Sequence, residues 1–173
     1  MLVNSAGYGL MGAVEDLDLE EQLGMLTTNC EALTRLTCLC LPYMRRNSRI
    51  INMASSAGFI PRAGFAVYAA TKAYVLRFSR ALNEELRYRS IYVTAVCPGP
   101  VDTEFFETAD QYGTDLGINR RSMAQPEPVV EKALRDSYLK KDMSVYSLPV
   151  KAFHVLTRLV PHRAIMAVTR YID

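Results

Sequence analysis

Tyr68 and Lys72 are the two residues of this sequence whose types and spacing most directly suggest chemistry. They lie four positions apart in a segment with helical periodicity, so their side chains share one face of a helix, one turn apart. A free phenol has a pKa of about 10 and is a poor base at neutral pH. A neighbouring ammonium favours the phenolate and lowers that pKa. The pair therefore predicts a tyrosine that exchanges protons with a substrate.

Two further polar residues extend this set. Ser55 lies at the end of a predicted strand, 13 positions before Tyr68, where its hydroxyl can donate a hydrogen bond to a substrate oxygen. Asn29 lies midway along an earlier predicted helix, where its amide can bond to the helix backbone or hold a water behind Lys72. Tyr-x-x-x-Lys alone occurs often by chance, so the inference depends on Ser55 and on the Pro-Gly turn after the next strand.

The elements that must position these residues alternate between strand and helix. Buried strands are predicted at the start of the chain and at 49–55, 91–97 and 143–149. Helices are predicted at 16–47, 65–89 and 126–142, with a polar, irregular segment at 102–125 that is typical of a functional lid. The alternation predicts an α/β fold: a parallel sheet with flanking helices, in one domain spanning 1–173. Residues 151–173 are expected to form an amphipathic helical tail, broken near Pro161.

Apolar periodicity predicts which helix faces are buried. Asp18, with Glu21 three residues later, predicts the start of the first long helix. Its expected core face consists of Leu23, Leu26, Leu33, Leu36 and Leu39. The expected apolar stripe of the second long helix consists of Val67, Tyr74, Phe78, Ala81 and Leu82.

Composition excludes several classes of function. The chain has 173 residues, a formal net charge of +2 and no basic run with interleaved aromatics, so we expect no nucleic-acid partner. Its four cysteines form no Cys-x-x-Cys pair and it has two histidines, so we expect no metal site and reduced thiols. Neither a signal peptide nor an apolar stretch of membrane-spanning length is evident, and we expect a cytoplasmic protein.

Four motifs in order resemble the short-chain dehydrogenase/reductase superfamily. "VNSAG" resembles its Asn-Asn-Ala-Gly motif, with Ser5 replacing the second Asn. "INMASSAG", "YAATK" and "CPGPVDT" resemble its catalytic-serine, Tyr-x-x-x-Lys and Pro-Gly segments. The resemblance covers residues 1 to about 150 and implies the C-terminal portion of a doubly wound, Rossmann-type parallel sheet.

The resemblance also implies a role for each matching residue. Tyr68 would be the general acid/base, Lys72 would bind the nicotinamide ribose, Ser55 would orient the carbonyl, and Asn29 would complete a proton relay. Ser56 competes for the serine role, but the family places its serine three residues before the glycine that is Gly58 here. The residues implied to bind the cofactor, besides Tyr68 and Lys72, are Asn4, Ala6, Gly7, Pro98, Gly99, Val101 and Thr103.

One part of the family pattern is not found in the sequence. The family begins with a strand, a glycine-rich turn and a helix whose N-terminus binds the pyrophosphate. Gly7, Gly9 and Gly12 have a similar spacing but follow the wrong strand, so we interpret them as a loop. We therefore expect an N-terminally truncated chain that begins inside the fourth strand of the domain.

The expected function is an NAD(P)-dependent oxidoreductase that acts on a carbonyl or alcohol, with NADP favoured over NAD and a homo-oligomer when full length. The alternative is a catalytically inactive truncated homologue that acts as a binding or regulatory partner. An epimerase or dehydratase of the extended branch would need a larger substrate domain than the residues after the Pro-Gly turn provide.

The tail at residues 151–173 allows two interpretations other than packing of its helices on the domain. Basic residues such as Lys151 and Arg158 alternate there with apolar ones such as Phe153 and Leu156. Such a segment could lie on a membrane surface or form one wall of a lipophilic substrate pocket. Packing of the terminal helices on the domain is the interpretation we prefer.

Overall fold

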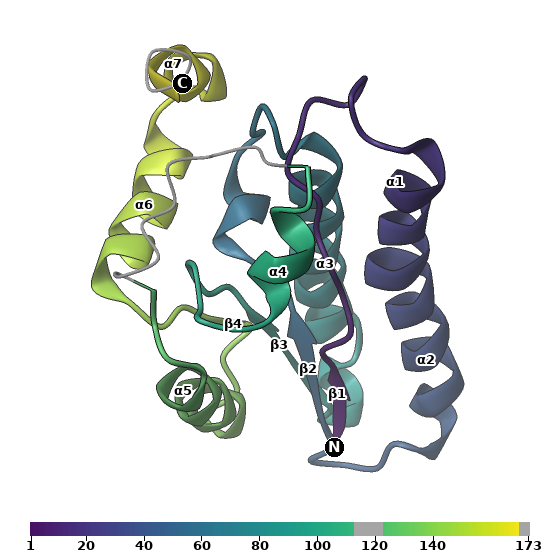
Figure 1. The fold of residues 1–173 in the computed structure, drawn as a ribbon. Helices are drawn as coiled ribbons and strands as arrows, with labels where there is room; N and C mark the ends of the chain where they lie inside the picture. The colour runs from purple at the N-terminus through teal and green to yellow at the C-terminus, as the bar shows by residue number, and fades with distance from the viewer. Residues whose placement is uncertain (113–122, 170–173) are drawn as a thin grey trace.

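The chain forms a parallel sheet of four strands in the order β1-β2-β3-β4, as Figure 1 shows. The structure is a computed structural model and describes residues 1–112 and 123–169, with side chains to residue 165. The strands are β1 (Leu2–Asn4), β2 (Arg49–Met53), β3 (Tyr92–Val96) and β4 (Met143–Ser144). The predicted α/β fold is confirmed, although the last strand has two residues instead of the predicted seven.

The seven α-helices of the described residues connect and flank these strands. They are α1 (Leu19–Leu26), α2 (Leu33–Cys40), α3 (Ala66–Glu85), α4 (Phe105–Ala109), α5 (Pro126–Tyr138), α6 (Leu148–Leu159) and α7 (His162–Thr169). A π-helical segment, η1 (Thr27–Ala32), joins α1 to α2. Short 3₁₀ turns, named η2 (Leu41–Tyr43), η3 (Ser56–Phe59) and η4 (Arg87–Arg89), complete the set.

Side chains of β2 alternate between two helix layers because successive residues of a strand point to opposite faces. Ile50 packs with Leu82 of α3 and with Leu86, which caps the end of that helix, whereas the next residue, Ile51, packs with Val129 and Ala133 of α5. Helices α3 and α5 therefore cover opposite faces of the sheet. The two central strands are buried on both faces, which explains their nearly continuous apolar sequences.

The first long helix begins as predicted but buries a different face. The Asp18 carboxylate accepts a hydrogen bond from the Glu21 backbone N–H at 3.0 Å, which confirms the N-cap. The expected core face is wrong except at Leu33: Leu23, Leu26, Leu36 and Leu39 are 44–62% exposed. The buried face carries instead Gln22, Met25, Asn29, Leu33 and Thr37. Polar residues are stable there because they bond across the interior.

The stripe predicted for α3 is also largely wrong. Leu82 is buried, but Tyr74 and Ala81 are exposed and Val67 and Phe78 are only partly buried. The buried residues of α3 are Tyr68, Ala69, Thr71, Lys72, Val75, Leu76, Ser79 and Leu82. The helix therefore turns its catalytic candidates inward, toward α1 and the strand ends.

The C-terminal segment forms two helices that are interrupted at Pro161, as predicted. Helix α6 packs against η3: the ring of Phe59 lies 4.4 Å from that of His154 and 6.3 Å from that of Phe153. Packing on the domain thus accounts for α6. No helix in the described part of the chain is both long and apolar enough to cross a membrane.

Candidate active site

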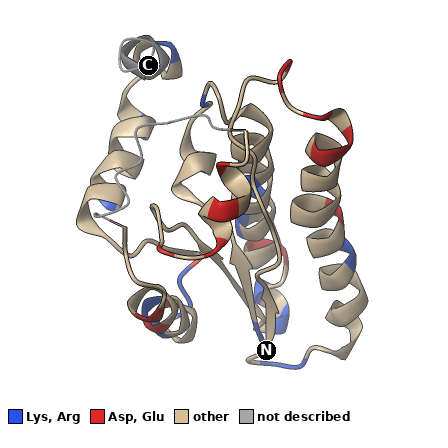
Figure 2. Cartoon of the chain, viewed as in Figure 1, with Lys and Arg blue, Asp and Glu red and all other residues tan. Residues whose placement is uncertain are grey.

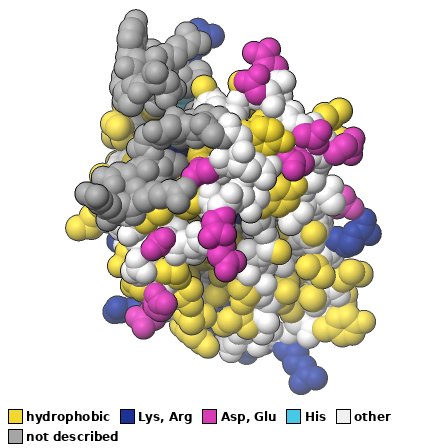
Figure 3. Space-filling model, in the orientation of Figure 1, with side chains coloured by type: hydrophobic (Ala, Val, Ile, Leu, Met, Phe, Trp, Pro, Cys, Tyr) yellow, Lys and Arg dark blue, Asp and Glu magenta, His cyan; other side chains and the backbone are white. Residues whose placement is uncertain are grey.

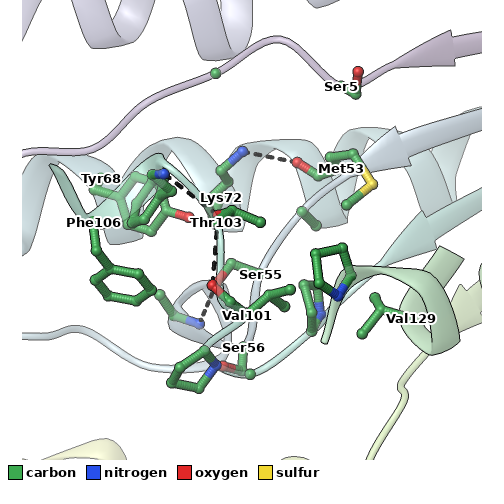
Figure 4. Close-up of a pocket in the computed structure, with 18 of the residues that line it drawn as sticks. Ser5, Met53, Ser55, Ser56, Tyr68, Lys72, Val101, Thr103, Phe106 and Val129 are labelled. Carbon is green, nitrogen blue, oxygen red and sulfur yellow. Dashed lines mark hydrogen bonds between the residues drawn. The ribbon is translucent and has the colours of Figure 1, made fainter. Parts of the chain in front are cut away.

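A cavity of about 370 Å³ lies at the carboxyl ends of the strands. In open α/β sheets this is the edge at which ligands bind. Figure 4 shows Ser55, Tyr68, Lys72 and Thr103 around this cavity, with Ser5 on the loop that follows β1. Segments far apart in the sequence therefore contribute to one site, including three of the four predicted catalytic residues.

Tyr68 lies in an aromatic and almost fully buried environment. Its side chain is 7% exposed, and its ring lies 4.3 Å from the ring of Phe65 and 5.3 Å from that of Phe105. Burial disfavours the phenolate and raises the pKa of Tyr68 to about 12. The expectation that Lys72 lowers this pKa below 10 is wrong for the protein without ligands, because desolvation outweighs the neighbouring groups.

Ser55 is positioned as the N-cap of η3. Its Oγ accepts a hydrogen bond from the backbone N–H of Ala57 at 3.1 Å, which fixes the side chain. A hydrogen bond between Ser55 and Tyr68 lowers the pKa of the phenol and partly offsets its burial. Ser56 also lines the cavity, and its backbone N–H donates to the Pro98 carbonyl at 2.9 Å. The contact with Tyr68 favours Ser55 over Ser56 as the serine of the site.

Lys72 reaches the cavity from the next turn of α3. Its side chain is 6% exposed, and Nζ donates to the carbonyl of Met53, at the end of β2, at 2.8 Å. Nζ also lies 5.5 Å from the centre of the Tyr68 ring. Burial lowers the pKa of Lys72 from 10.5 to about 8, so the group still carries a proton at neutral pH. An ammonium has three N–H donors, so the bond to Met53 does not exhaust its capacity.

Asn29 supports the site from the π-helical segment. Its Oδ1 accepts from the backbone N–H of Tyr8 at 3.1 Å, and its Nδ2 donates to the Tyr8 carbonyl at 2.8 Å and to Thr71 Oγ1 at 3.0 Å. The side chain is thus bonded to the loop after β1 rather than to its own helix. π-Helical turns are frequent at functional sites, but no simple sequence pattern reveals them.

Glycines let the loop after β1 approach the catalytic side chains. A Cβ on Gly7 would lie 2.8 Å from Asn29 Oδ1 and 3.3 Å from Lys72 Nζ, and a Cβ on Gly9 would lie 2.6 Å from Cδ2 of Tyr68. These glycines therefore serve close packing in an irregular segment. The loop interpretation of Gly7, Gly9 and Gly12 agrees with this geometry.

The residues predicted to bind the cofactor divide into two groups. Gly7 and the four residues of the Pro-Gly segment line the cavity, namely Pro98, Gly99, Val101 and Thr103. Asn4 and Ala6 are not among the lining residues. The Asn4 amide donates instead to Asn52 Oδ1 at 2.8 Å and to Thr37 Oγ1 at 3.0 Å, in a buried network that joins β1, β2 and α2. The sheet-stabilising role expected of Asn4 is thus the one its contacts support.

Several other residues that line the cavity were not predicted from the sequence. Phe65, Phe105 and Phe106 contribute aromatic walls, and Arg62 contributes a positive charge. The position of Arg62 in the loop just before the Tyr-x-x-x-Lys helix was the only signal available for it. Within the described ranges, no three histidine, cysteine or acidic side chains are grouped closely enough to hold a metal ion.

The sequence of this chain matches a known protein family. The family model "short chain dehydrogenase" matches residues 1–112. The uncharacterized oxidoreductase YbbO of Escherichia coli is 32% identical over 171 residues, which cover 94% of this chain and 64% of that protein. A probable NADP-dependent dehydrogenase of Haemophilus influenzae is 38% identical over 142 residues, which cover 78% of this chain and 56% of that protein.

A solved structure shows the same fold. A short-chain dehydrogenase from Sphingobium yanoikuyae in complex with NADPH aligns with a TM-score of 0.78 and 31% identity over 96% of this chain. That alignment covers 64% of the Sphingobium chain. The chain thus spans between about half and two thirds of the length of the proteins it matches.

Proposed function

The chain belongs to the short-chain dehydrogenase/reductase family, and from its site we propose that it carries the catalytic machinery of an NAD(P)-dependent oxidoreductase that reduces a carbonyl to an alcohol. The observation that carries the proposal is the convergence of Ser55, Tyr68 and Lys72 on one cavity. A small carbonyl compound is the proposed substrate. This activity, like the substrate, is a proposal for the whole protein.

The cavity fits the nicotinamide end of such a cofactor. Gly7 and Gly99 line it without side chains, so a flat ring and its ribose could approach the backbone closely. Lys72 Nζ would donate to a ribose hydroxyl, and Thr103 would bond to the carboxamide or to a phosphate. The bound cofactor would supply the hydride. We propose NADP over NAD, because a relative is described as NADP-dependent and a related structure contains NADPH.

The protonated phenol of Tyr68 agrees with a role as proton donor in the proposed reduction. With a pKa of about 12, the phenol is protonated at neutral pH and can donate its proton to a carbonyl oxygen that gains negative charge. Ser55 Oγ accepts from the Ala57 amide, so its own hydrogen can be directed at the same substrate oxygen. The Lys72 ammonium would help stabilise the phenolate left behind. Asn29 would support this site by fixing the loop at Tyr8 and, as proposed for the family pattern, by taking part in a proton relay.

We also propose that the protein forms a homo-oligomer through the first long helix. The exposed large apolar side chains of α1, α2 and the following turn η2 are Leu19, Leu23, Leu26, Leu36, Leu39 and Tyr43. Figure 3 shows hydrophobic side chains gathered over the region of α2. An apolar surface of this kind is typical of an interface between subunits.

The proposed activity is tested by carbonyl-dependent oxidation of NADPH and NADH. The assay should use the protein expressed from its complete reading frame and a panel of aldehydes and ketones. We expect turnover of at least one carbonyl compound and faster oxidation of NADPH than of NADH. Binding of either cofactor without turnover of any carbonyl would instead support the alternative, a non-catalytic binding homologue.

A further inference from the structure

Arg62 places a permanent positive charge on the wall of the cavity. Among the described lining residues, only Arg62 and Lys72 carry charge at neutral pH, and none is acidic. Lys72 Nζ donates to the Met53 carbonyl, and its remaining donors are assigned to the cofactor ribose in the proposed function. A guanidinium stays protonated at any working pH and binds carboxylates with two parallel hydrogen bonds. Its five N–H donors allow it to bind such a group in addition to the partners it already has.

The loop that carries Arg62 is fixed at both of its ends. It follows η3, whose N-cap is Ser55, and it ends where the backbone N–H of Phe65 donates to the Arg62 carbonyl at 3.3 Å. The Gly64 carbonyl accepts from the Gly12 backbone N–H at 2.8 Å, and this ties the loop to the segment after β1. Arg62 therefore belongs to a fixed loop and lines the same cavity as Ser55 and Tyr68, the two groups proposed to act on the substrate oxygen.

One side of the cavity, at Thr103 and Phe105, adjoins a hollow with negative charge. A neighbouring hollow shares Gly7, Thr103 and Phe105 with the cavity and is lined by Asp102 and Glu104. Figure 2 marks acidic residues on α4 and on the segment before it. A ligand anion would be attracted to Arg62 and repelled from this side, so the charges favour one orientation.

The remaining walls are apolar, formed by residues such as Phe106 and Val129. We propose that the protein selects carbonyl substrates that carry an acid group, such as a carboxylate or a sulfonate, on an apolar skeleton, and that Arg62 binds this group. The inference rests on the proposed reductase function and names its substrate class. The same guanidinium could instead bind a cofactor phosphate, and the test separates the two sources of negative charge.

The test compares substrates that differ only in charge. The value of kcat/KM is measured with 4-carboxybenzaldehyde and with its methyl ester for the natural protein, Arg62→Gln, Arg62→Lys and Arg87→Gln. Arg87 is a matched control because it is 74% exposed and pairs with Glu84 outside the cavity. We expect the preference for the acid to fall about 10- to 100-fold in Arg62→Gln. Arg62→Lys should retain part of it, and Arg87→Gln should retain all of it.

Two outcomes overturn the proposal and leave the reductase function standing. An unchanged ratio of acid to ester in Arg62→Gln would show that Arg62 does not bind the substrate. An equal loss with both substrates, together with weaker NADPH binding by fluorescence titration, would assign Arg62 to the cofactor. A readout without turnover is the calorimetric binding of 4-(hydroxymethyl)benzoate to the cofactor complex, which should weaken in Arg62→Gln and not in Arg87→Gln. If no carbonyl is turned over, this binding still tests the role of Arg62 separately from the reaction.

Discussion

Tyr68 is subject to two opposing influences on its pKa. Burial between Phe65 and Phe105 raises it, while the hydrogen bond with Ser55 lowers it, and burial prevails. The four-residue spacing on one helix predicted that Lys72 neighbours Tyr68, and Nζ of Lys72 lies 5.5 Å from the centre of the Tyr68 ring. The sequence could not give the sign of the pKa shift, because the sign depends on how completely distant segments exclude water.

Lys72 yields a prediction about stability and pH. Its pKa is 10.5 as an ordinary lysine and about 8 in the folded protein. Between these values the unfolded chain holds one proton more than the folded chain, so the free energy of unfolding rises with pH across this window. We expect the stability of the natural protein, measured relative to Lys72→Met, to increase by up to about 3 kcal/mol from pH 8 to pH 10.5.

Urea unfolding of both proteins at several pH values measures this difference. The comparison reduces the contributions of other groups, such as Cys97, which titrates in this range in the unfolded chain and whose pKa burial raises from 9.0 to about 12 in the folded protein. A difference that stays constant from pH 8 to pH 10.5 would contradict the shift assigned to Lys72.

At the scale of elements, the first long helix shows what periodicity can and cannot establish. Asp18 and Glu21 determined its start because capping is a local interaction. The leucine pattern predicted a core face, but Leu33 is the only one of its five leucines that is buried. The face that is buried contains Asn29 and Thr37, whose partners lie on other segments. A hydrophobic pattern cannot predict the burial of polar residues whose hydrogen-bond partners lie far away in the sequence.

The π-helical segment yields a prediction because it presents Asn29 to the loop after β1. Replacing Asn29 with Ala leaves the backbone N–H and carbonyl of Tyr8 without their partners in a partly buried place. We expect the free energy of unfolding to fall by about 2 kcal/mol. Activity should fall as well, because the loop packs on Lys72 and Tyr68.

Chemical denaturation and steady-state kinetics measure these two effects. Thr27→Ala is the matched control, since Thr27 belongs to the same segment and is exposed. Equal stability of the two variants would mean that the Asn29 contacts contribute nothing to the fold.

At the scale of the whole molecule, the sheet ends in an apolar edge. Strand β1 has β2 on one side, and Val3, which points to the face covered by α5, is 50% exposed. Helix α5 packs on the central strands and does not extend over β1. The chain spans 64% of the related NADPH-bound structure, and the family members therefore contain residues with no counterpart in this chain.

The exposed leucines of the first long helix yield a prediction about assembly. Glutamates at positions 36 and 39 would place two charges in the proposed subunit interface, where burying them is costly. We expect Leu36→Glu/Leu39→Glu to convert an oligomer into a monomer in size-exclusion chromatography with light scattering. Tyr88→Glu is the control, because Tyr88 is 85% exposed on η4. A natural protein that is already monomeric would contradict the proposed interface.

The central claim is that Tyr68 transfers the proton to the substrate, and one comparison of variants tests it most directly. Tyr68→Phe removes only the phenolic oxygen, while Tyr74→Phe removes that of a tyrosine on the same helix, which is 42% exposed and bonded to Thr34 at 2.8 Å. Carbonyl-dependent NADPH oxidation is measured for both, with NADPH affinity determined separately. We expect Tyr68→Phe to lose at least about 100-fold in kcat at nearly unchanged affinity, and Tyr74→Phe to remain active. Full activity of Tyr68→Phe would contradict the account.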